Sequence, residues 1–134
     1  MPLHRLPWPR IERLVAALTA ANGILGLVVW ATGPAPRGAV DSLLPIALLG
    51  LLSGALAWRG RLGGHGAGIV FYGVQLAAFH GYHAMQAYRL PWTFSLAFVV
   101  HLPAGVLVVN GFAVAMLAAS AALLGWRFRT LIPQ

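Results

Sequence analysis

The sequence predicts an all-α integral membrane protein, a four-helix bundle that runs up, down, up and down with both termini in the cytoplasm. Two observations predict this fold class. Of the 134 residues, 60% are apolar and only 8% are charged, whereas an ordinary soluble domain carries about 25% charged residues. The chain also contains four apolar segments close to the roughly 20 residues that cross a bilayer as a helix. We expect residues 1–134 to form a single transmembrane domain.

The four predicted helices cover residues 14–32, 43–58, 66–88 and 104–126. Asp41 and Ser42 suit the N-cap of the second helix, because their side-chain oxygens accept hydrogen bonds from free N–H groups in the first turn. Residues 91–103 are expected to be kinked or interfacial, since Pro103 interrupts a helix. The tryptophans agree with these borders: Trp8, Trp30, Trp58, Trp92 and Trp126 all lie at segment ends, where Trp rings concentrate in membranes.

Arginines give the expected orientation. Seven lie in flanks that share one side of the membrane, namely Arg5, Arg10, Arg13, Arg59, Arg61, Arg127 and Arg129, and two lie on the other, Arg37 and Arg89. Because short cytoplasmic loops are rich in basic residues, this bias places both termini in the cytoplasm. The chain has no Lys, a usage typical of GC-rich bacterial genomes, so we expect a multi-pass protein of the bacterial inner membrane. The alternative for the first segment, a signal peptide, is disfavoured by its length of about 19 residues.

Composition excludes several functions. The absence of Cys rules out disulfides and thiolate metal sites. A net charge of +7 on so apolar a chain points to lipid head groups rather than nucleic acid. Glu12 and Asp41 are the only acidic residues and are expected at opposite interfaces, so neither a catalytic carboxylate pair nor an intramembrane carboxylate for proton-coupled export is expected. The Gly-rich stretch 60–68, which includes His65, is predicted to be a flexible cytoplasmic loop and not a phosphate cradle. Enzymatic activity is therefore not expected.

Small residues recur at helical spacing in the second, third and fourth segments. Helices in lipid associate through close backbone approach at such positions. The predicted packing or interface residues are Gly50, Gly54, Gly73, Ala77, Gly81, Gly111 and Ala115. The favoured interpretation is packing within the chain, and the alternative is a dimer or a docking face for a larger complex.

The predicted third helix is unusually polar for a membrane helix. Polar groups at membrane depth are costly and usually face a partner or a cavity. The predicted polar membrane face comprises Tyr72, Gln75, Tyr82 and Gln86, with Asn110 of the fourth helix as a partner.

Three histidines form the candidate cofactor and metal site. His80 and His83 are three residues apart and would share one face of a helix, and His101 is expected at a similar depth. The favoured interpretation is that these imidazoles hydrogen-bond between helices. The alternative is that His80, His83 and His101 bind haem b or copper, both of which accept imidazole ligands.

These observations favour a small, non-catalytic accessory or structural membrane protein that self-associates or docks on a larger membrane complex. The expected partners are the lipid bilayer and a second copy or a membrane complex, and not nucleic acid. One alternative is a redox protein that holds haem b or copper with the three histidines. Another is a small transporter or channel lined by Gln75, His83 and Asn110.

Overall fold

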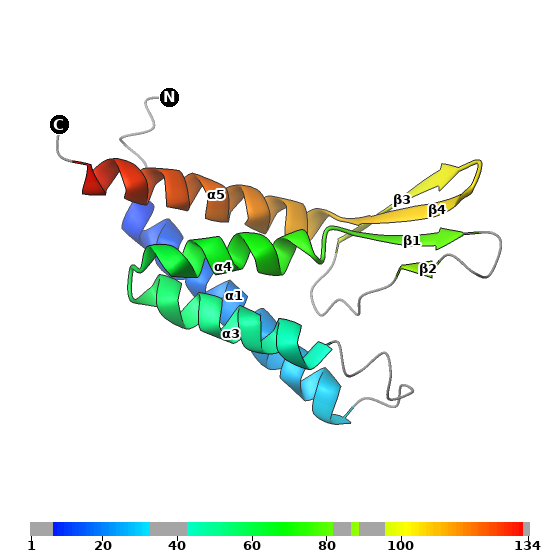
Figure 1. Cartoon of the computed structure of the whole chain (residues 1–134), viewed down its shortest axis with the longest axis horizontal. Coiled ribbons are helices and arrows are strands. Elements are labelled where there is room, and N and C mark those ends of the chain that lie inside the picture. The colour runs from blue at the N-terminus through cyan, green and yellow to red at the C-terminus, as the bar shows by residue number, and fades with distance from the viewer. Residues whose placement is uncertain (1–6, 33–42, 82–86, 89–95, 133–134) are drawn as a thin grey trace.

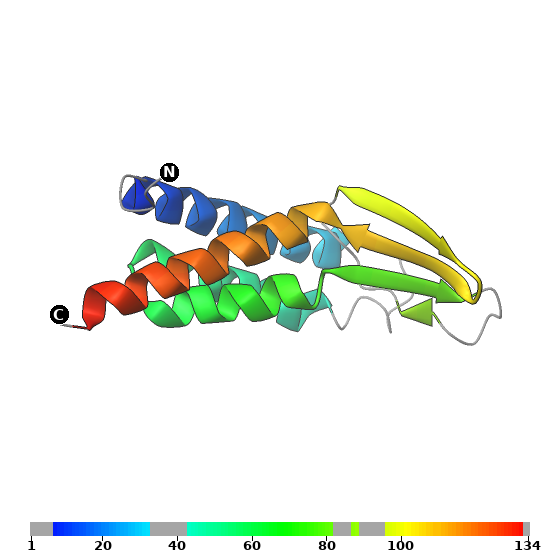
Figure 2. The same cartoon turned by 90° about the horizontal axis from the view of Figure 1, so that it is seen from above.

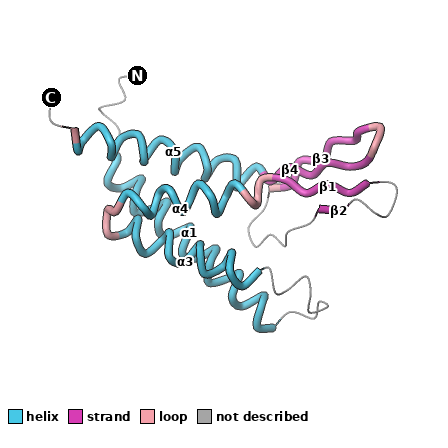
Figure 3. The backbone as a smooth tube through the Cα atoms, in the orientation of Figure 1, coloured by secondary structure: helices cyan, strands magenta, loops and turns pink. Residues whose placement is uncertain are grey.

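The computed structural model describes residues 7–32, 43–81, 87–88 and 96–132, and this part of the chain is mostly helical with one small sheet (Figure 1, Figure 3). The four helices are α1 (Trp8–Thr32), α3 (Leu43–Trp58), α4 (Leu62–Gly73) and α5 (Gly111–Leu131). The strands are β1 (Ala77–Gly81), β2 (Ala87–Tyr88), β3 (Ala97–Leu102) and β4 (Gly105–Asn110). The prediction of an all-α fold is therefore confirmed only in part, because the described residues are mostly helical but also form a sheet.

The helices run alternately in opposite directions and pack alongside one another, forming what we call the helical part (Figure 2). The start of α1, the end of α3, the start of α4 and the end of α5 consequently share one end of the molecule. We call it the arginine end, because it carries Arg10, Arg13, Arg59, Arg61, Arg127 and Arg129. The rings of Trp8 and Trp126 stack there with centroids 5.8 Å apart.

Local sequence explains where the helices begin. The carbonyl of Pro7 accepts a hydrogen bond from the N–H of Arg10 at 2.9 Å, which forms the first turn of α1. Gly60 has φ of +67°, a conformation open to glycine that allows the sharp turn between α3 and α4. The side-chain oxygen of Asn110 accepts a hydrogen bond from the N–H of Ala113 at 3.3 Å and so caps α5.

Glycines allow α1 and α3 to approach closely. A Cβ added at Gly23 would lie 2.7 Å from the backbone nitrogen of Leu51, and one added at Gly54 would lie 2.8 Å from that of Ala20. Both distances are too short for a side chain. The two backbones are therefore in direct contact, a close approach that small residues at an interface allow.

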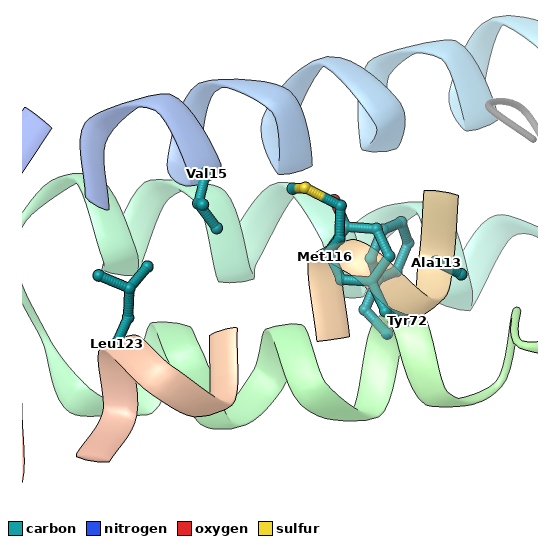
Figure 4. Close-up of a cluster of buried hydrophobic side chains, with 6 residues drawn as sticks. Val15, Tyr72, Ala113, Met116 and Leu123 are labelled. Carbon is teal, nitrogen blue, oxygen red and sulfur yellow. The ribbon is translucent and has the colours of Figure 1, made fainter. Parts of the chain in front are cut away.

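An apolar cluster fills the centre of the helical part, with side chains from α1, α4 and α5 (Figure 4). Its buried members are Val15, Phe71, Tyr72, Ala113, Met116 and Leu123. The rings of Phe71 and Tyr72 pack edge to face with centroids 4.9 Å apart, a favoured arrangement for aromatic pairs. Tyr72 and Leu123 are completely inaccessible to solvent.

The antiparallel sheet extends from α4 and α5 away from the arginine end, in the order β2-β1-β4-β3 (Figure 1). β4 leads directly into α5 without an intervening residue. β3 pairs with β4 from Ala97 opposite Asn110 to Leu102 opposite Gly105. All six residues of β3 are exposed, so this edge strand has no core on either face within the described residues.

The structure corrects the predicted third and fourth helices. Residues 66–88 were expected to be one helix, but α4 ends at Gly73 and residues 77–81 form β1. Residues 91–103 were expected to be kinked or interfacial, and the fourth helix was expected from 104, but 97–102 and 105–110 form a hairpin. The physical reason is that runs rich in Val on both sides of Pro103 favour strands, and proline with the following residue makes the turn. Residues 82–86 and 89–95 lie outside the described residues.

Two helices, α1 and α5, are long and apolar enough to cross a membrane. At 1.5 Å per residue they span about 37 Å and about 31 Å, against roughly 30 Å for the hydrocarbon core of a bilayer. α3 is apolar but shorter, with 16 residues.

Candidate functional site

The most strongly interacting polar residues in the described structure are Glu12, His65 and Arg127, which we call the ionic cluster. His65 Nε2 lies 2.8 Å from Glu12 Oε1. Arg127 donates from Nε to Glu12 Oε1 at 2.9 Å and from Nη2 to Glu12 Oε2 at 2.5 Å. Because an ionised carboxylate only accepts hydrogen bonds, His65 must donate from Nε2. Glu12 is thus a buried acceptor for three donors from two other helices.

The ionic cluster lies at the arginine end, where four helix ends meet. α1 supplies Glu12, α4 supplies His65 and α5 supplies Arg127. A Cβ at Gly64 would lie only 2.2 Å from the backbone nitrogen of Ala57 on α3, so the first turn of α4 rests directly on α3. This contact holds His65, the next residue, toward the interior.

In the ionic cluster, the negative charge of Glu12 is paired with the positive charge of Arg127, and the imidazole of His65 lies beside Glu12. Glu12 is 4% exposed and His65 1%, while the side chain of Arg127 is 30% exposed. Two charges in a low-dielectric interior are tolerated only when they pair and their remaining hydrogen-bonding capacity is met. The guanidinium of Arg127 also lies over the ring of Trp126, 4.9 Å from its centroid, a cation–π contact.

One atom of the ionic cluster is unsatisfied. His65 Nδ1 is buried and has no hydrogen-bond partner among the described residues. In a neutral imidazole that donates from Nε2, this nitrogen carries a free lone pair. His65 Nδ1 is therefore a buried hydrogen-bond acceptor that is left unsatisfied within the described residues.

A second polar contact lies two helical turns further from the arginine end. The hydroxyls of Thr19 and Tyr72 are 2.9 Å apart. Thr19 already donates to the carbonyl of Val15 at 2.7 Å, so the hydroxyl of Tyr72 is the donor to Thr19. Like the contact of Glu12 with His65, the contact of Thr19 with Tyr72 joins α1 to α4. Thr19 follows Glu12 by seven residues and Tyr72 follows His65 by seven residues. The same alignment of α1 against α4 therefore repeats after two turns.

The predicted histidine site is only partly within the described residues. His80 on β1 and His101 on β3 both pair with Val106 of β4, so they occupy one row of the sheet. His101 is exposed. His83 lies outside the described residues. Among the residues that the structure describes, no three His, Cys, Asp or Glu side chains lie together as a metal site would require.

The predicted polar membrane face is also only partly within the described residues. Tyr72, Gln75 and Asn110 are buried. The side-chain nitrogen of Gln75 donates to the carbonyl of Phe71 at 3.0 Å, and Asn110 caps α5. Tyr82 and Gln86 lie outside the described residues.

The predicted packing residues have varied surroundings. Gly50 and Gly54 lie in the tight contact between α1 and α3, and a Cβ at Gly111 would meet the ring of Phe98 at 2.4 Å. Gly73 has no atom within 4 Å of the corresponding point, and Ala115 is exposed. Two further predicted packing residues lie in β1 instead of on a helix: Ala77 and Gly81.

Sequence reasoning missed Glu12 and His65 as functional candidates. Glu12 was expected at the interface, and His65 in a flexible loop, but both are buried within the helical part. The available indication was that Glu12 is the only acidic residue before Asp41 and sits at the start of an apolar helix, where an unpaired charge is costly. No protein-family model matches the chain, and no curated protein or solved structure matches it.

Proposed function

We propose that this chain is a small polytopic membrane protein that acts as a non-catalytic accessory or structural component, joined to a second copy or to a larger membrane complex. The observation that carries the proposal is the edge strand β3, which is apolar, exposed on all six residues and unpaired along its outer side within the described residues. Such a strand is a template for pairing with another chain.

The surface of the helical part supports a lipid environment. Its large apolar side chains are exposed on all four helices, including Ile24, Leu48, Leu52, Val70 and Val114. Its buried residues include polar side chains, namely those of Glu12, His65, Thr19, Ser53 and Ser120. An apolar exterior over a partly polar interior suits lipid, which offers no partner to polar groups.

The outer side of β3 can be defined by the hydrogen-bond alternation of antiparallel pairs. The N–H of Gly111 donates to the carbonyl of Leu96 at 2.8 Å, which makes this pair and every second pair along β3 the hydrogen-bonded ones. Ala97, Val99 and His101 therefore direct their backbone N–H and C=O groups away from β4. These outward groups form an open sheet edge, which is a template for another strand, so a partner strand at this edge would complete the sheet.

The proposed location is the bacterial inner membrane, with the arginine end in the cytoplasm. Arginines of four helix ends gather there, and the sheet lies at the opposite end. Cytoplasmic ends of membrane helices carry such an excess of basic residues. The sheet would then lie at the periplasmic side of the bilayer.

Assembly is tested by substitutions at Val99. Val99→Pro removes an outward N–H that β4 does not use, while Val99→Thr keeps the N–H and the branched shape. Each variant is purified in mild detergent from native membranes, and its associated mass is measured by cross-linking and native mass spectrometry. We expect wild type and Val99→Thr to carry a stoichiometric partner and Val99→Pro to lose it. A monomeric wild-type protein in detergent and in lipid would overturn the proposal.

We propose as a second candidate that the histidines bind haem b or a metal ion. The favourable observation is the shared row of His80 and His101, whose backbones are two strand spacings apart, about 10 Å. Two histidines whose backbones are separated by this distance can bind the same metal ion. Elemental analysis of untagged protein should find near-stoichiometric iron or copper that at least two of His80→Ala, His83→Ala and His101→Ala remove. Metal below about a tenth per chain would end this idea.

A further inference from the structure

The helical part gathers positive charge at the arginine end, and most of this charge is unpaired. Five of the six arginines there are exposed: Arg10, Arg13, Arg59, Arg61 and Arg129. Among the described residues the only acidic side chain is that of Glu12, which is buried and paired with Arg127. The five exposed guanidinium groups therefore have no side-chain carboxylate as a partner in the described part of the chain.

The ionic cluster holds the arginine-bearing segments together. Arg127 on α5 donates two hydrogen bonds to Glu12, in the first turns of α1. The guanidinium of Arg127 also lies against the turn between α3 and α4, because a Cβ at Gly60 would be 2.6 Å from Arg127 Nη2. The start of α1 and this turn are thus both in contact with Arg127. These two segments carry four of the exposed arginines: Arg10, Arg13, Arg59 and Arg61.

Five unpaired positive charges at one end of a small molecule call for an anion. Like charges held together repel one another and oppose compact packing of the helix ends, and a bound anion offsets this repulsion. The guanidinium group presents a planar set of N–H donors that matches the oxygens of phosphate and carboxylate groups. A partner that brings phosphate groups to this end therefore suits it in charge and in geometry.

Exposed arginines at three helix ends adjoin large apolar side chains that are also exposed. The neighbours in sequence are Arg13 with Leu14, Arg59 with Trp58, and Arg129 with Phe128. Leu14 and Trp58 are each 60% exposed and Phe128 is 51% exposed. A ligand that satisfies both members of such a pair carries an anionic group next to hydrocarbon. A phospholipid has this structure, whereas a free phosphate ion or a nucleic acid lacks the hydrocarbon.

Two further tryptophans at the arginine end fit the same partner. Trp8 and Trp126 stack with their centroids 5.8 Å apart, and both rings are only partly buried. Tryptophan rings concentrate where the head groups of a bilayer meet its hydrocarbon. The phosphate of a lipid lies at this same level, so the rings and the guanidinium groups would meet one molecule.

We propose that the arginine end is a binding surface for anionic phospholipid. The guanidinium groups of α1 and of the turn between α3 and α4 contact the head-group phosphate, and the adjoining apolar side chains contact the acyl chains. A zwitterionic phospholipid carries its own cation beside the phosphate, so it compensates this surface less well. The inference goes beyond the proposed assembly and rests on it only for the membrane location.

Lipid preference is measured in vesicles of phosphatidylcholine and phosphatidylglycerol, in which either one lipid or the other has brominated acyl chains. Bromine quenches the fluorescence of nearby tryptophans. Trp30→Phe with Trp92→Phe leaves the three tryptophans of the arginine end as the fluorescent ones: Trp8, Trp58 and Trp126. We expect phosphatidylglycerol to be preferred by about fivefold, since one arginine near anionic lipid contributes roughly this factor.

Substitutions of the exposed arginines locate the surface. Each test variant removes two of them: Arg10→Gln with Arg13→Gln, or Arg59→Gln with Arg61→Gln. Each should at least halve the preference for phosphatidylglycerol, while circular dichroism shows unchanged helix content. The matched control, Arg37→Gln with Arg89→Gln, removes two arginines that are outside the arginine end in sequence and should keep the preference. An unchanged preference in both test variants would overturn the proposal.

Salt provides a test that needs no substitution at an arginine. From about 0.1 M to about 1 M potassium chloride the screening length falls from about 10 Å to about 3 Å, so the preference should fall as well. Equal quenching by the two brominated lipids at low salt would overturn the proposal. It would leave assembly through β3 standing, because the mass of a protein partner is measured separately. A preference abolished by inorganic phosphate, but not by chloride at the same ionic strength, would assign the surface to free phosphate and overturn the proposal.

Discussion

The helical part and the sheet satisfy their polar groups in opposite ways. In the helical part, several polar side chains are buried and hydrogen-bonded to another helix, and many large apolar side chains are exposed. In the sheet, β3 exposes apolar residues on both faces and leaves one edge of backbone groups without a described partner. Under the proposed function, the helical part would be complete in lipid by itself, whereas the sheet would need another surface to be complete. Stability should depend on the first region and association on the second.

The largest effect on stability is expected from Glu12→Ala. This substitution leaves Arg127 and His65 without their shared acceptor, and breaking a buried ion pair costs about 3–5 kcal/mol. The partial exposure of Arg127 places the expected loss at the lower end, about 3 kcal/mol. The free energy of unfolding is measured by titration with sodium dodecyl sulfate in mild detergent micelles. Arg129→Ala is the control, and a loss for Glu12→Ala no larger than the control's would contradict the role of the ionic cluster.

A smaller loss is expected when α4 is pushed away from α3. Gly64→Ala places a methyl group 2.2 Å from the backbone nitrogen of Ala57, and overpacking of this kind costs about 1–3 kcal/mol. Gly66→Ala, two residues along, meets nothing within 4 Å and should stabilise the helix by about 0.5–1 kcal/mol. The same titration compares both variants with wild type. Equal stabilities for the pair would show that the two helices are not in backbone contact.

Tyr72→Phe tests the second polar level with the shape of the ring unchanged. Loss of the hydrogen bond to Thr19 should cost about 1 kcal/mol. Thr19→Val should cost a similar amount, and the double variant should cost less than the sum, since the two residues share one interaction. The unfolding titration of all four proteins completes the cycle. Strict additivity would indicate that the two hydroxyls do not interact.

The smallest effect on stability is expected in the sheet. Val99→Thr alters a side chain that is 55% exposed, so the free energy of unfolding should change by less than about 0.5 kcal/mol. The same titration measures it. A larger loss in the isolated chain would show that β3 is packed against this same molecule, and the contrast between the two regions would then fail.

Sequence alone predicts the first two helices well and the rest of the fold poorly. Residues 43–58 match α3 at both ends, and α1 differs only in its start, at Trp8 instead of 14. In both segments long apolar runs are bounded by residues that stop helices. The segments that form strands are equally apolar, and hydropathy alone does not distinguish a short apolar strand from a helix. The β-branched residues on both sides of Pro103 indicate a hairpin. For this segment that pattern is a better guide to secondary structure than the overall apolar composition.

The candidate site was predicted less well because it depends on contacts distant in sequence. Tyr72 and Gln75 were expected on a polar face and both are buried, although α4 ends at Gly73, before Gln75. The ionic cluster joins residues 53 and 115 positions apart. No periodicity connects Glu12 to Arg127, and the basic flank around Glu12 hides its role. Only the packing of α1, α4 and α5 brings them together.

The direct join between β4 and α5 links the two ends of the molecule mechanically. With no loop between them and Asn110 capping the helix, a twist of the sheet turns α5 as a rigid rod. Arg127 lies near the opposite end of that rod, sixteen residues or about 24 Å away. A partner strand that re-orients the sheet would thereby shift the guanidinium against Glu12. Binding at the sheet would then alter an ion pair at the arginine end.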